Sequence, residues 1–192
     1  MGGLLRSGTF WSLVLLMVCA GASEQGMSQW ASAFAESALH LSKTAGDLAG
    51  PCCFALLMGT ARALYGTFSD RVPLKKAMAL CAVLCVMCYT LAAFAPHPAL
   101  GLAGCAFCGF SVGIFWPGTF SMAAKALPAG GTAMYALLAL AGDLGCSSGP
   151  GLVGLVSGSA DGELKIGILA AAVFPVVMLV RLALISRKSP KR

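Results

Sequence analysis

The sequence predicts an all-α integral membrane protein with six transmembrane helices. Of its 192 residues, 58% are hydrophobic and only 10% are charged, whereas soluble globular domains carry about 25% charged residues. The apolar residues also gather in long runs, and a bilayer core of about 30 Å needs about 20 such residues in a helix. The strands of a transmembrane β-barrel would instead alternate polar and apolar residues over about ten positions. The runs in this chain do not alternate, so the sequence favours helices.

Six apolar segments are long enough to span a bilayer, and short polar or proline-containing stretches separate them. The segments cover residues 9–36, 47–69, 77–95, 99–123, 132–157 and 164–186. Only the turn around Pro96-His97-Pro98 joins the third segment to the fourth. Such short connections predict antiparallel neighbours. Pro117 and Pro150 should bend the fourth and fifth helices within the membrane.

The first segment has two interpretations. Arg6, the apolar run up to Val18 and the small residues 20–22 follow the pattern of a cleavable signal peptide. Further polar residues recur at helical spacing beyond the cleavage point, namely Gln25, Gln29, Ser32 and Glu36. This stripe predicts one helix that continues to about Glu36. We therefore expect a first transmembrane helix over 9–36, with cleavage as the alternative.

The basic residues predict the orientation of the helices. If the N-terminus is inside, one side of the membrane collects Arg6, Arg71, Lys75, Lys76, Lys125, Arg187, Lys188, Lys191 and Arg192, and the other side only Lys43 and Lys165. Because basic loops stay cytoplasmic, both termini should be cytoplasmic, in a plasma (inner) membrane. The net charge of +6 does not indicate a nucleic-acid partner, because the basic residues form short clusters rather than one charged face.

The nine cysteines have a metal-site alternative. Cys85 and Cys88, followed by Cys105 and Cys108, match the spacing of a zinc ribbon. The flanking residues are apolar, however, and Cys81, Cys85 and Cys88 share one helix face. We therefore expect thiols buried as small hydrophobic groups, and no metal or cofactor.

Two histidines at predicted helix ends, His40 and His97, complete no catalytic set with an acid or a nucleophile at one depth. The sequence therefore predicts that the chain is not an enzyme.

Three ionisable residues lie away from the ends of the predicted spans: Glu24, Arg62 and Asp143. Such groups are costly in a bilayer, so each is a functional candidate. One hypothesis is that Arg62 and Asp143 form a structural ion pair across two helices. The other is that these residues handle substrate or protons. Both remain open at this point.

A polar stripe near the end of the first segment offers a second candidate site. Gln25, Gln29 and Ser32 lie on one helical face, and Trp30 is beside them. Amide and hydroxyl groups next to an aromatic ring suit a hydroxylated ligand. Hydrogen bonding between helices, which holds membrane bundles together without a ligand, is the alternative.

The segment between the second and third spans resembles motif A of the major facilitator superfamily. That motif has a Gly, three residues, Asp-Arg, a second Gly and a basic pair; here Pro73 replaces the second Gly and the basic pair comes one residue late. Asp70 ends a helix, where the dipole disfavours an anion, so a basic partner or another helix N-terminus would stabilise it. Gly66 permits close packing. The resemblance implies a conformational latch made of Gly66, Asp70, Arg71 and Lys75.

Other segments resemble fucose-permease-like members of that superfamily. Residues 21–30 are similar to their seventh helix, residues 115–118 to their tenth and residues 145–150 to their eleventh. The resemblance implies the C-terminal six of twelve helices. These would form a single domain over 1–192, built as two inverted three-helix repeats over 9–95 and 99–186.

The resemblance also implies a function. The first, second, fourth and fifth helices would line a cavity, while the third and sixth, including the cysteine-rich third helix, would face lipid. The implied substrate-binding or coupling residues are Glu24, Gln25, Gln29, Trp30, Arg62, Trp116 and Asp143. The expected activity is secondary active transport, by symport and alternating access, of a small polar, sugar-like solute.

Transport by this fold needs two halves. The second half would be another six-helix chain or another copy of this one; otherwise the chain is a fragment. The alternative from a different class is a non-transporting membrane scaffold or a truncated transporter remnant.

Overall fold

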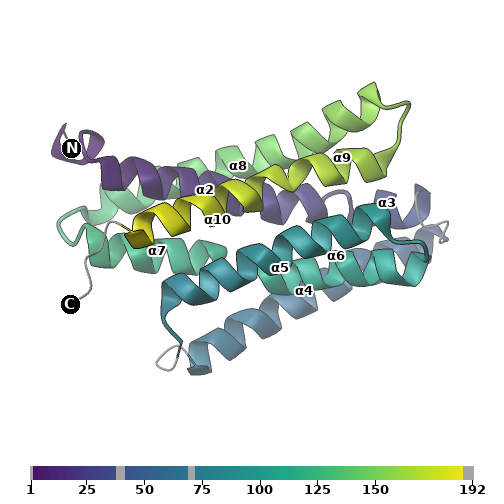
Figure 1. Cartoon of the computed structure of the whole chain (residues 1–192), viewed down its shortest axis with the longest axis horizontal. Helices are drawn as coiled ribbons and strands as arrows, with labels where there is room; N and C mark the ends of the chain where they lie inside the picture. Colours follow the sequence, from purple (N-terminus) through teal and green to yellow (C-terminus); the bar gives the residue numbers. More distant parts are fainter. Residues whose placement is uncertain (1, 38–41, 69–71, 188–192) are drawn as a thin grey trace.

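The computed structural model describes residues 2–37, 42–68 and 72–187. Within these ranges the chain forms helices and no strand, and six helical segments are long and apolar enough to cross a membrane. The prediction of an all-α membrane protein with six spans is therefore confirmed. Figure 1 shows an elongated bundle in which the start of the first span and the end of the last span lie at the same end.

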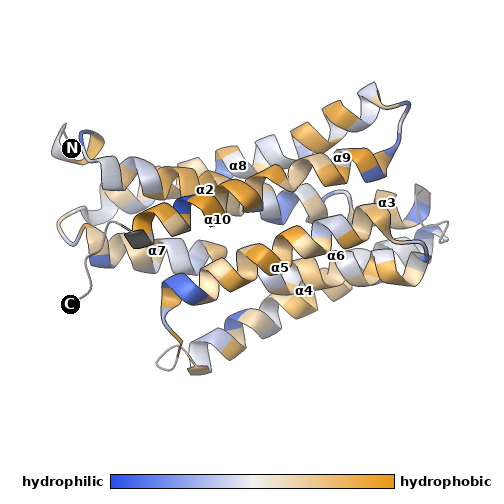
Figure 2. Cartoon of the chain, viewed as in Figure 1, coloured by the Kyte–Doolittle hydropathy of each residue, from blue (hydrophilic) through white to orange (hydrophobic). Residues whose placement is uncertain are grey.

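The elements follow the predicted order. The first three spans comprise α2 (Gly8–Ser28), α4 (Lys43–Phe68) and α5 (Leu74–Phe94), with the short helices α1 (Gly2–Leu5) before α2 and α3 (Ala31–Ser37) after it. The last three spans comprise α6 (Pro98–Val112) with α7 (Phe115–Ala126), α8 (Gly131–Ser159), and α9 (Leu164–Ala171) with α10 (Val173–Arg187). Hydrophobic residues dominate the middle of these helices and hydrophilic ones lie mostly toward the ends (Figure 2).

Three segments predicted as continuous helices are interrupted. The fourth span breaks at residues 113–114 and the sixth at residue 172. Proline has no N–H to donate to the carbonyl four residues before it, and both breaks lie three to five residues before a proline, Pro117 or Pro175. The first segment breaks at residues 29–30, where the Trp30 indole bonds to α8 instead of lying along a continuous polar stripe.

Glycines bring the first and fifth spans into backbone contact. A Cβ atom at Gly21 would overlap the Gly142 carbonyl, and one at Gly145 would overlap the Val18 carbonyl. Small residues permit this approach where two membrane helices pack closely. The contact places α2 in the centre of the bundle, where α6, α7, α8, α9 and α10 all touch it. The side chains of α2 therefore have fixed neighbours on several sides.

The cysteines of α5 point into the bundle. Cys85 and Cys88 are buried, and the Cys85 Sγ lies 3.9 Å from the Cys108 Sγ of α6. The opposite face of α5 exposes large apolar side chains, namely Leu80, Val83, Met87, Leu91 and Phe94. The predicted shared face of the cysteines is thus an inner face. No group of three or more His, Cys, Asp or Glu among the described residues is placed to hold a metal ion.

Candidate functional site

A cavity of about 380 Å³ lies between α2, α4 and α7. Its lining consists of Glu24, Arg62, Trp116, Pro117 and Phe120. Three of these residues, one each from the first, second and fourth spans, are candidates from the sequence. The cavity therefore joins side chains that are separated by up to 96 positions in the chain, from Glu24 to Phe120.

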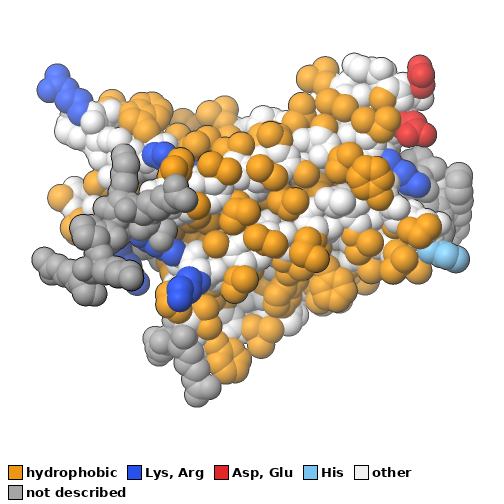
Figure 3. All heavy atoms as spheres, viewed as in Figure 1, with side chains coloured by type: hydrophobic (Ala, Val, Ile, Leu, Met, Phe, Trp, Pro, Cys, Tyr) orange, Lys and Arg blue, Asp and Glu red, His pale blue; other side chains and the backbone are white. Residues whose placement is uncertain are grey.

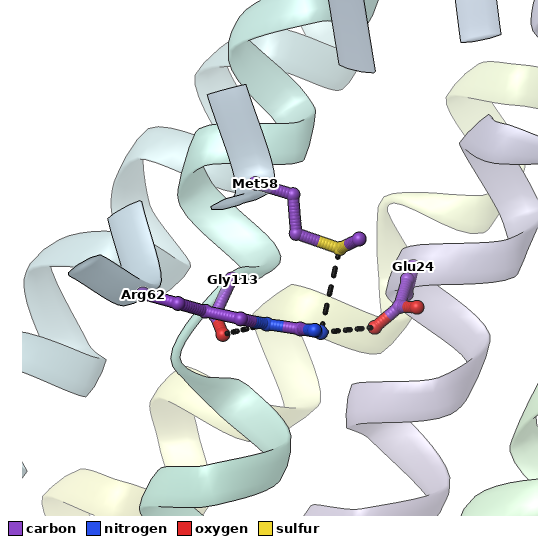
Figure 4. A network of polar contacts seen from close by, with 4 residues as sticks. All are labelled: Glu24, Met58, Arg62 and Gly113. Carbon is purple, nitrogen blue, oxygen red and sulfur yellow. Dashed lines mark hydrogen bonds and ion pairs between the residues drawn. The ribbon is translucent and has the colours of Figure 1, made fainter. Parts of the chain in front are cut away.

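Arg62 is the centre of the polar contacts in this cavity (Figure 4). Its Nε donates a hydrogen bond to the Gly113 carbonyl oxygen at 3.0 Å. Its Nη2 lies 3.9 Å from the Glu24 Oε2 and 3.5 Å from the Met58 Sδ. The Arg62 side chain is 45% exposed and that of Glu24 only 15%, so the arginine reaches from the open side of the bundle toward a mostly enclosed carboxylate.

The acceptor for Arg62 exists because the fourth span is broken. In a regular helix the residue at position 117 would donate its N–H to the Gly113 carbonyl, but Pro117 has none. α4 also approaches Gly113 closely, since a Cβ there would lie 2.9 Å from the Ala61 Cβ and from the Met58 carbonyl oxygen. A proline and a glycine four residues apart thus expose a carbonyl to the guanidinium from α4.

Glu24 is incompletely satisfied in this arrangement. The 3.9 Å separation from Arg62 is too long for a hydrogen bond. Its Oε2 is buried and has no hydrogen-bond partner among the described residues. A buried oxygen in this state can take a proton or accept a hydrogen bond from a ligand hydroxyl. The site can therefore bind a hydrogen-bond donor beside a cation.

Aromatic rings form the other side of the cavity. The Trp116 and Phe120 ring centroids are 6.2 Å apart, and Phe120 continues the contact to Tyr135 of α8 at 5.9 Å. A Cβ at Gly142 would overlap the Trp116 ring. The indole can therefore pack against α8 because Gly142 has no side chain. The result is an apolar surface of tilted aromatic rings next to the Glu24–Arg62 pair.

The predicted pair between Arg62 and Asp143 is wrong. The carboxylate within ion-pair distance of Arg62 is Glu24, and Asp143 is exposed on α8 outside the lining of the cavity. The reason is helix rotation: α8 turns its glycine face to α2. Asp143, one residue after Gly142 of that face, projects to the side.

The polar stripe of the first segment does not join this cavity. Trp30 donates its indole N–H to the Pro150 carbonyl oxygen at 3.1 Å and packs over Gly154. Gln25 is partly buried and Gln29 is exposed, and neither lines the cavity. The structure thus gives Trp30 a contact between helices, which was the alternative hypothesis for this stripe.

The predicted latch is described only in part. Asp70 and Arg71 lie outside the described residues. A Cβ at Gly66 would meet no heavy atom of the described chain within 4 Å, and the role of Gly66 in the latch stays a prediction. Lys75 is exposed at the start of α5 and lines a second, larger cavity.

A comparison with known families identifies the family of this chain. A sequence model of the Major Facilitator Superfamily matches residues 1–150. The chain belongs to the major facilitator superfamily. Proteins of this superfamily are membrane transporters and not enzymes, so the chain is a multi-pass member of a transporter family. No curated protein matches the sequence.

Sequence reasoning missed three residues of the site, namely Gly113, Phe120 and Met58. Gly113 could have been found from Pro117, because the carbonyl four residues before a proline loses its helical donor. Phe120 follows Trp116 by one helical turn, so both rings share a face. The role of Met58 beside Arg62 has no comparable signal in the sequence.

Proposed function

We propose that this major facilitator protein is a six-helix half of a secondary active transporter that moves a small polar, sugar-like solute by alternating access. The observation that carries the proposal is the Glu24–Arg62 pair opposite the Trp116 ring in one cavity. Charged groups inside membrane helices mark substrate and ion pathways. The aromatic surface next to them suits the apolar face of a sugar ring, while the charged groups suit its hydroxyls.

Glu24 is the proposed coupling residue for proton symport. Its buried Oε2 has no hydrogen-bond partner among the described residues, and its cationic neighbour is 3.9 Å away. A proton on Glu24 would weaken the attraction to Arg62 and free both groups to rearrange. Three other candidates would contribute polar groups to solute binding or coupling: Gln25, which is partly buried, and Gln29 and Asp143, which are exposed. Trp30 would contribute by holding α2 against α8. The similarity of residues 21–30 to fucose-permease-like members favours a sugar-like solute.

A second six-helix bundle is the proposed partner, either a separate half or another copy. Small and polar residues such as Gly59, Thr60, Ala63 and Thr67 outnumber the large apolar residues on the exposed surface of α4, although Leu48, Leu56, Leu64 and Phe68 are exposed there too. The exposed face of α5 carries large apolar residues instead. Small residues are typical of helix–helix contacts in membranes. The α4 face therefore suits another helix better than lipid, and a partner there would close the cavity that Arg62 enters.

The proposed setting is a plasma membrane with both termini in the cytoplasm. On the face shown in Figure 3, Lys and Arg side chains gather mainly at the end of the bundle that holds the start of the first span, and the visible Asp and Glu side chains lie at the other end. This asymmetry supports the orientation. Gly66, Asp70, Arg71 and Lys75 would then form the latch on the cytoplasmic side.

Uptake by vesicles tests the function. Vesicles containing the protein would be given a panel of labelled sugars, with and without an inward proton gradient. We expect gradient-dependent uptake of one sugar class, and its loss in Glu24→Gln. Glu36→Gln is the matched control, since Glu36 is an exposed carboxylate on α3 outside the cavity. No uptake of any solute, alone or with a second six-helix chain, would contradict transport and favour the scaffold alternative.

The association state tests the partner. A polar face exposed to lipid is unfavourable, so the chain purified alone should run as a dimer or larger in mild detergent. Arg62→Leu should shift this equilibrium toward the monomer, because it removes the charge at the open side of the cavity. A stable monodisperse monomer would count against the half-transporter proposal.

A further inference from the structure

A second cavity in the bundle combines cationic side chains with an apolar lining. It has a volume of about 820 Å³ and lies where the ends of α2, α5, α7 and α10 diverge. These are the ends near the start of the first span and the close of the last one (Figure 1). It shares no lining residue with the Glu24–Arg62 cavity. The proposed solute site therefore does not account for it.

Three cations line this cavity, one each from α5, α7 and α10: Lys75, Lys125 and Arg181. The rest of the lining is apolar or uncharged, and no carboxylate is among the lining residues. None of the three cations has a carboxylate within 4 Å among the described residues, where the ion pair is that of Arg62 with Glu24. Three like charges around one cavity repel each other unless an anion lies between them.

Arg181 lies within the membrane-spanning part of the last span. It is six residues before the end of α10, which corresponds to roughly 9 Å along a helix. Its Nη2 donates to the Ser12 Oγ of α2, and the Ser12 hydroxyl in turn donates to the Gly8 carbonyl oxygen at 2.6 Å. The Arg181 Nε is buried and has no hydrogen-bond partner among the described residues. The guanidinium is thus held in place by α2 while its charge remains uncompensated.

The surroundings of the three cations indicate which kind of anion fits the cavity. The cavity lies between α5 and α10, the spans that expose large apolar side chains such as Leu80 and Val180, and its lining mixes Lys and Arg with Leu13, Leu74 and Leu184. Three N–H-bearing cations match a phosphate group, which accepts several charge-assisted hydrogen bonds. Apolar walls at the same site match acyl chains. Basic pockets between helices on the cytoplasmic side bind phospholipid headgroups in other membrane proteins.

We propose that this cavity binds a phosphate-bearing anion through Lys75, Lys125 and Arg181, and that the source is the headgroup of an anionic phospholipid. The bound phosphate reduces the repulsion among the three cations and bridges α5, α7 and α10 to the α2 end that Ser12 anchors. The lipid then holds together the four helix ends that diverge around the cavity. This site shares no lining residue with the proposed solute site, although Lys75 also belongs to the proposed latch.

Lipid-dependent thermal stability of the purified chain tests the proposal. Detergent-solubilised protein would be titrated with short-chain phosphatidylglycerol, with phosphatidylcholine of the same chain length and with inorganic phosphate, and the midpoint of unfolding followed by tryptophan fluorescence. We expect phosphatidylglycerol to raise the midpoint and phosphatidylcholine to have little effect. In Lys75→Gln/Lys125→Gln, the dissociation constant for phosphatidylglycerol should rise roughly thirtyfold, because each lysine contributes about a fivefold factor.

The matched control is Lys43→Gln/Lys165→Gln, which removes two cations outside the cavity and should leave the dissociation constant unchanged. Both lysines of the test variant are exposed, and their removal relieves repulsion with Arg181, so its midpoint without lipid should equal or exceed that of the unmodified chain. If inorganic phosphate raises the midpoint of the unmodified chain but not that of the test variant, the phosphate site is supported and its ligand is assigned to a soluble anion. The proposal would be overturned if neither phosphatidylglycerol nor inorganic phosphate raised the midpoint. It would also be overturned if the midpoints of the two double variants rose equally. Arg181→Lys, which keeps the charge but loses the planar fork, should bind phosphatidylglycerol more weakly than the unmodified chain does.

Discussion

Arg62 donates its Nε–H to the Gly113 carbonyl oxygen at 3.0 Å, at the break of the fourth span. That carbonyl is free of a helical donor because Pro117, four residues later, has no N–H. A cation from the second span therefore replaces a backbone hydrogen bond of the fourth. The same cation faces the Glu24 carboxylate of the first span. A rearrangement of any one of these spans would consequently change the contacts of the other two.

The Glu24–Arg62 pair should appear as coupling in a double-mutant cycle. We expect Glu24→Gln and Arg62→Gln each to lower the melting temperature, and the double variant to lose less than the sum. Because the Arg62 side chain is 45% exposed, the coupling should be only about 0.5–1 kcal/mol. Arg62→Gln combined with Asp143→Asn is the control and should be additive. Coupling to Asp143 and not to Glu24 would show that the pairing described above is wrong.

Pro117→Ala should restore the N–H that Gly113 lacks. The new backbone bond would compete with Arg62 for the carbonyl, and a hydrogen bond to a charged group contributes about 1.5–3 kcal/mol. We expect uptake to fall roughly tenfold or more while the melting temperature stays the same or rises. Pro175→Ala, at the other proline-related break, lies outside the cavity and should retain uptake. Unchanged uptake in Pro117→Ala would mean that the break does not serve the site.

The backbone contact between α2 and α8 should tolerate no side chain at Gly145. Gly145→Ala would place a Cβ against the Val18 carbonyl, and overpacking of this kind costs about 1–3 kcal/mol. We expect lower expression and a lower melting temperature. Gly151→Ala in the same helix meets no described heavy atom within 4 Å and should be neutral or slightly stabilising, since Ala favours helix over Gly. Equal effects of the two substitutions would argue against this packing.

Trp30 should act on stability more than on solute affinity. Trp30→Phe keeps an aromatic ring and removes the hydrogen bond to the Pro150 carbonyl, a loss of about 0.5–1.5 kcal/mol. The melting temperature should fall, while the apparent KM for solute should stay within about twofold, the effect of less than 0.5 kcal/mol. A large rise in KM with unchanged stability would instead make Trp30 a ligand contact.

The orientation can be measured by labelling single cysteines in a cysteine-free background. Positions next to His97 and Asp161, in the turns that follow α5 and α8, should react with an impermeant reagent from outside. Positions next to Lys75 and Pro128 should react only after the membrane is opened, because basic loops remain cytoplasmic. External labelling beside Pro128 would reverse the topology.

The number, order and approximate limits of the spans could be predicted from the sequence, because the thickness of the hydrocarbon core sets how many apolar residues a helix needs. This property is local, so each segment shows it without reference to the others. The helix bend linked to Pro117 was predictable for the same reason, since a proline acts on the carbonyl four residues before it. The resemblance of residues 66–76 to motif A likewise required only neighbouring residues.

The partner of Arg62 was decided by the tertiary structure. Glu24 and Asp143 both carry a carboxylate inside a predicted span, and the sequence pattern alone favours neither. The rotation of each helix about its axis makes the choice, and contacts such as that of Gly145 with the Val18 carbonyl determine the rotation of α2 and α8. These contacts join residues more than a hundred positions apart. Only the packed bundle therefore places Glu24 beside Arg62, leaves Asp143 at the surface and gathers Lys75, Lys125 and Arg181 around one cavity.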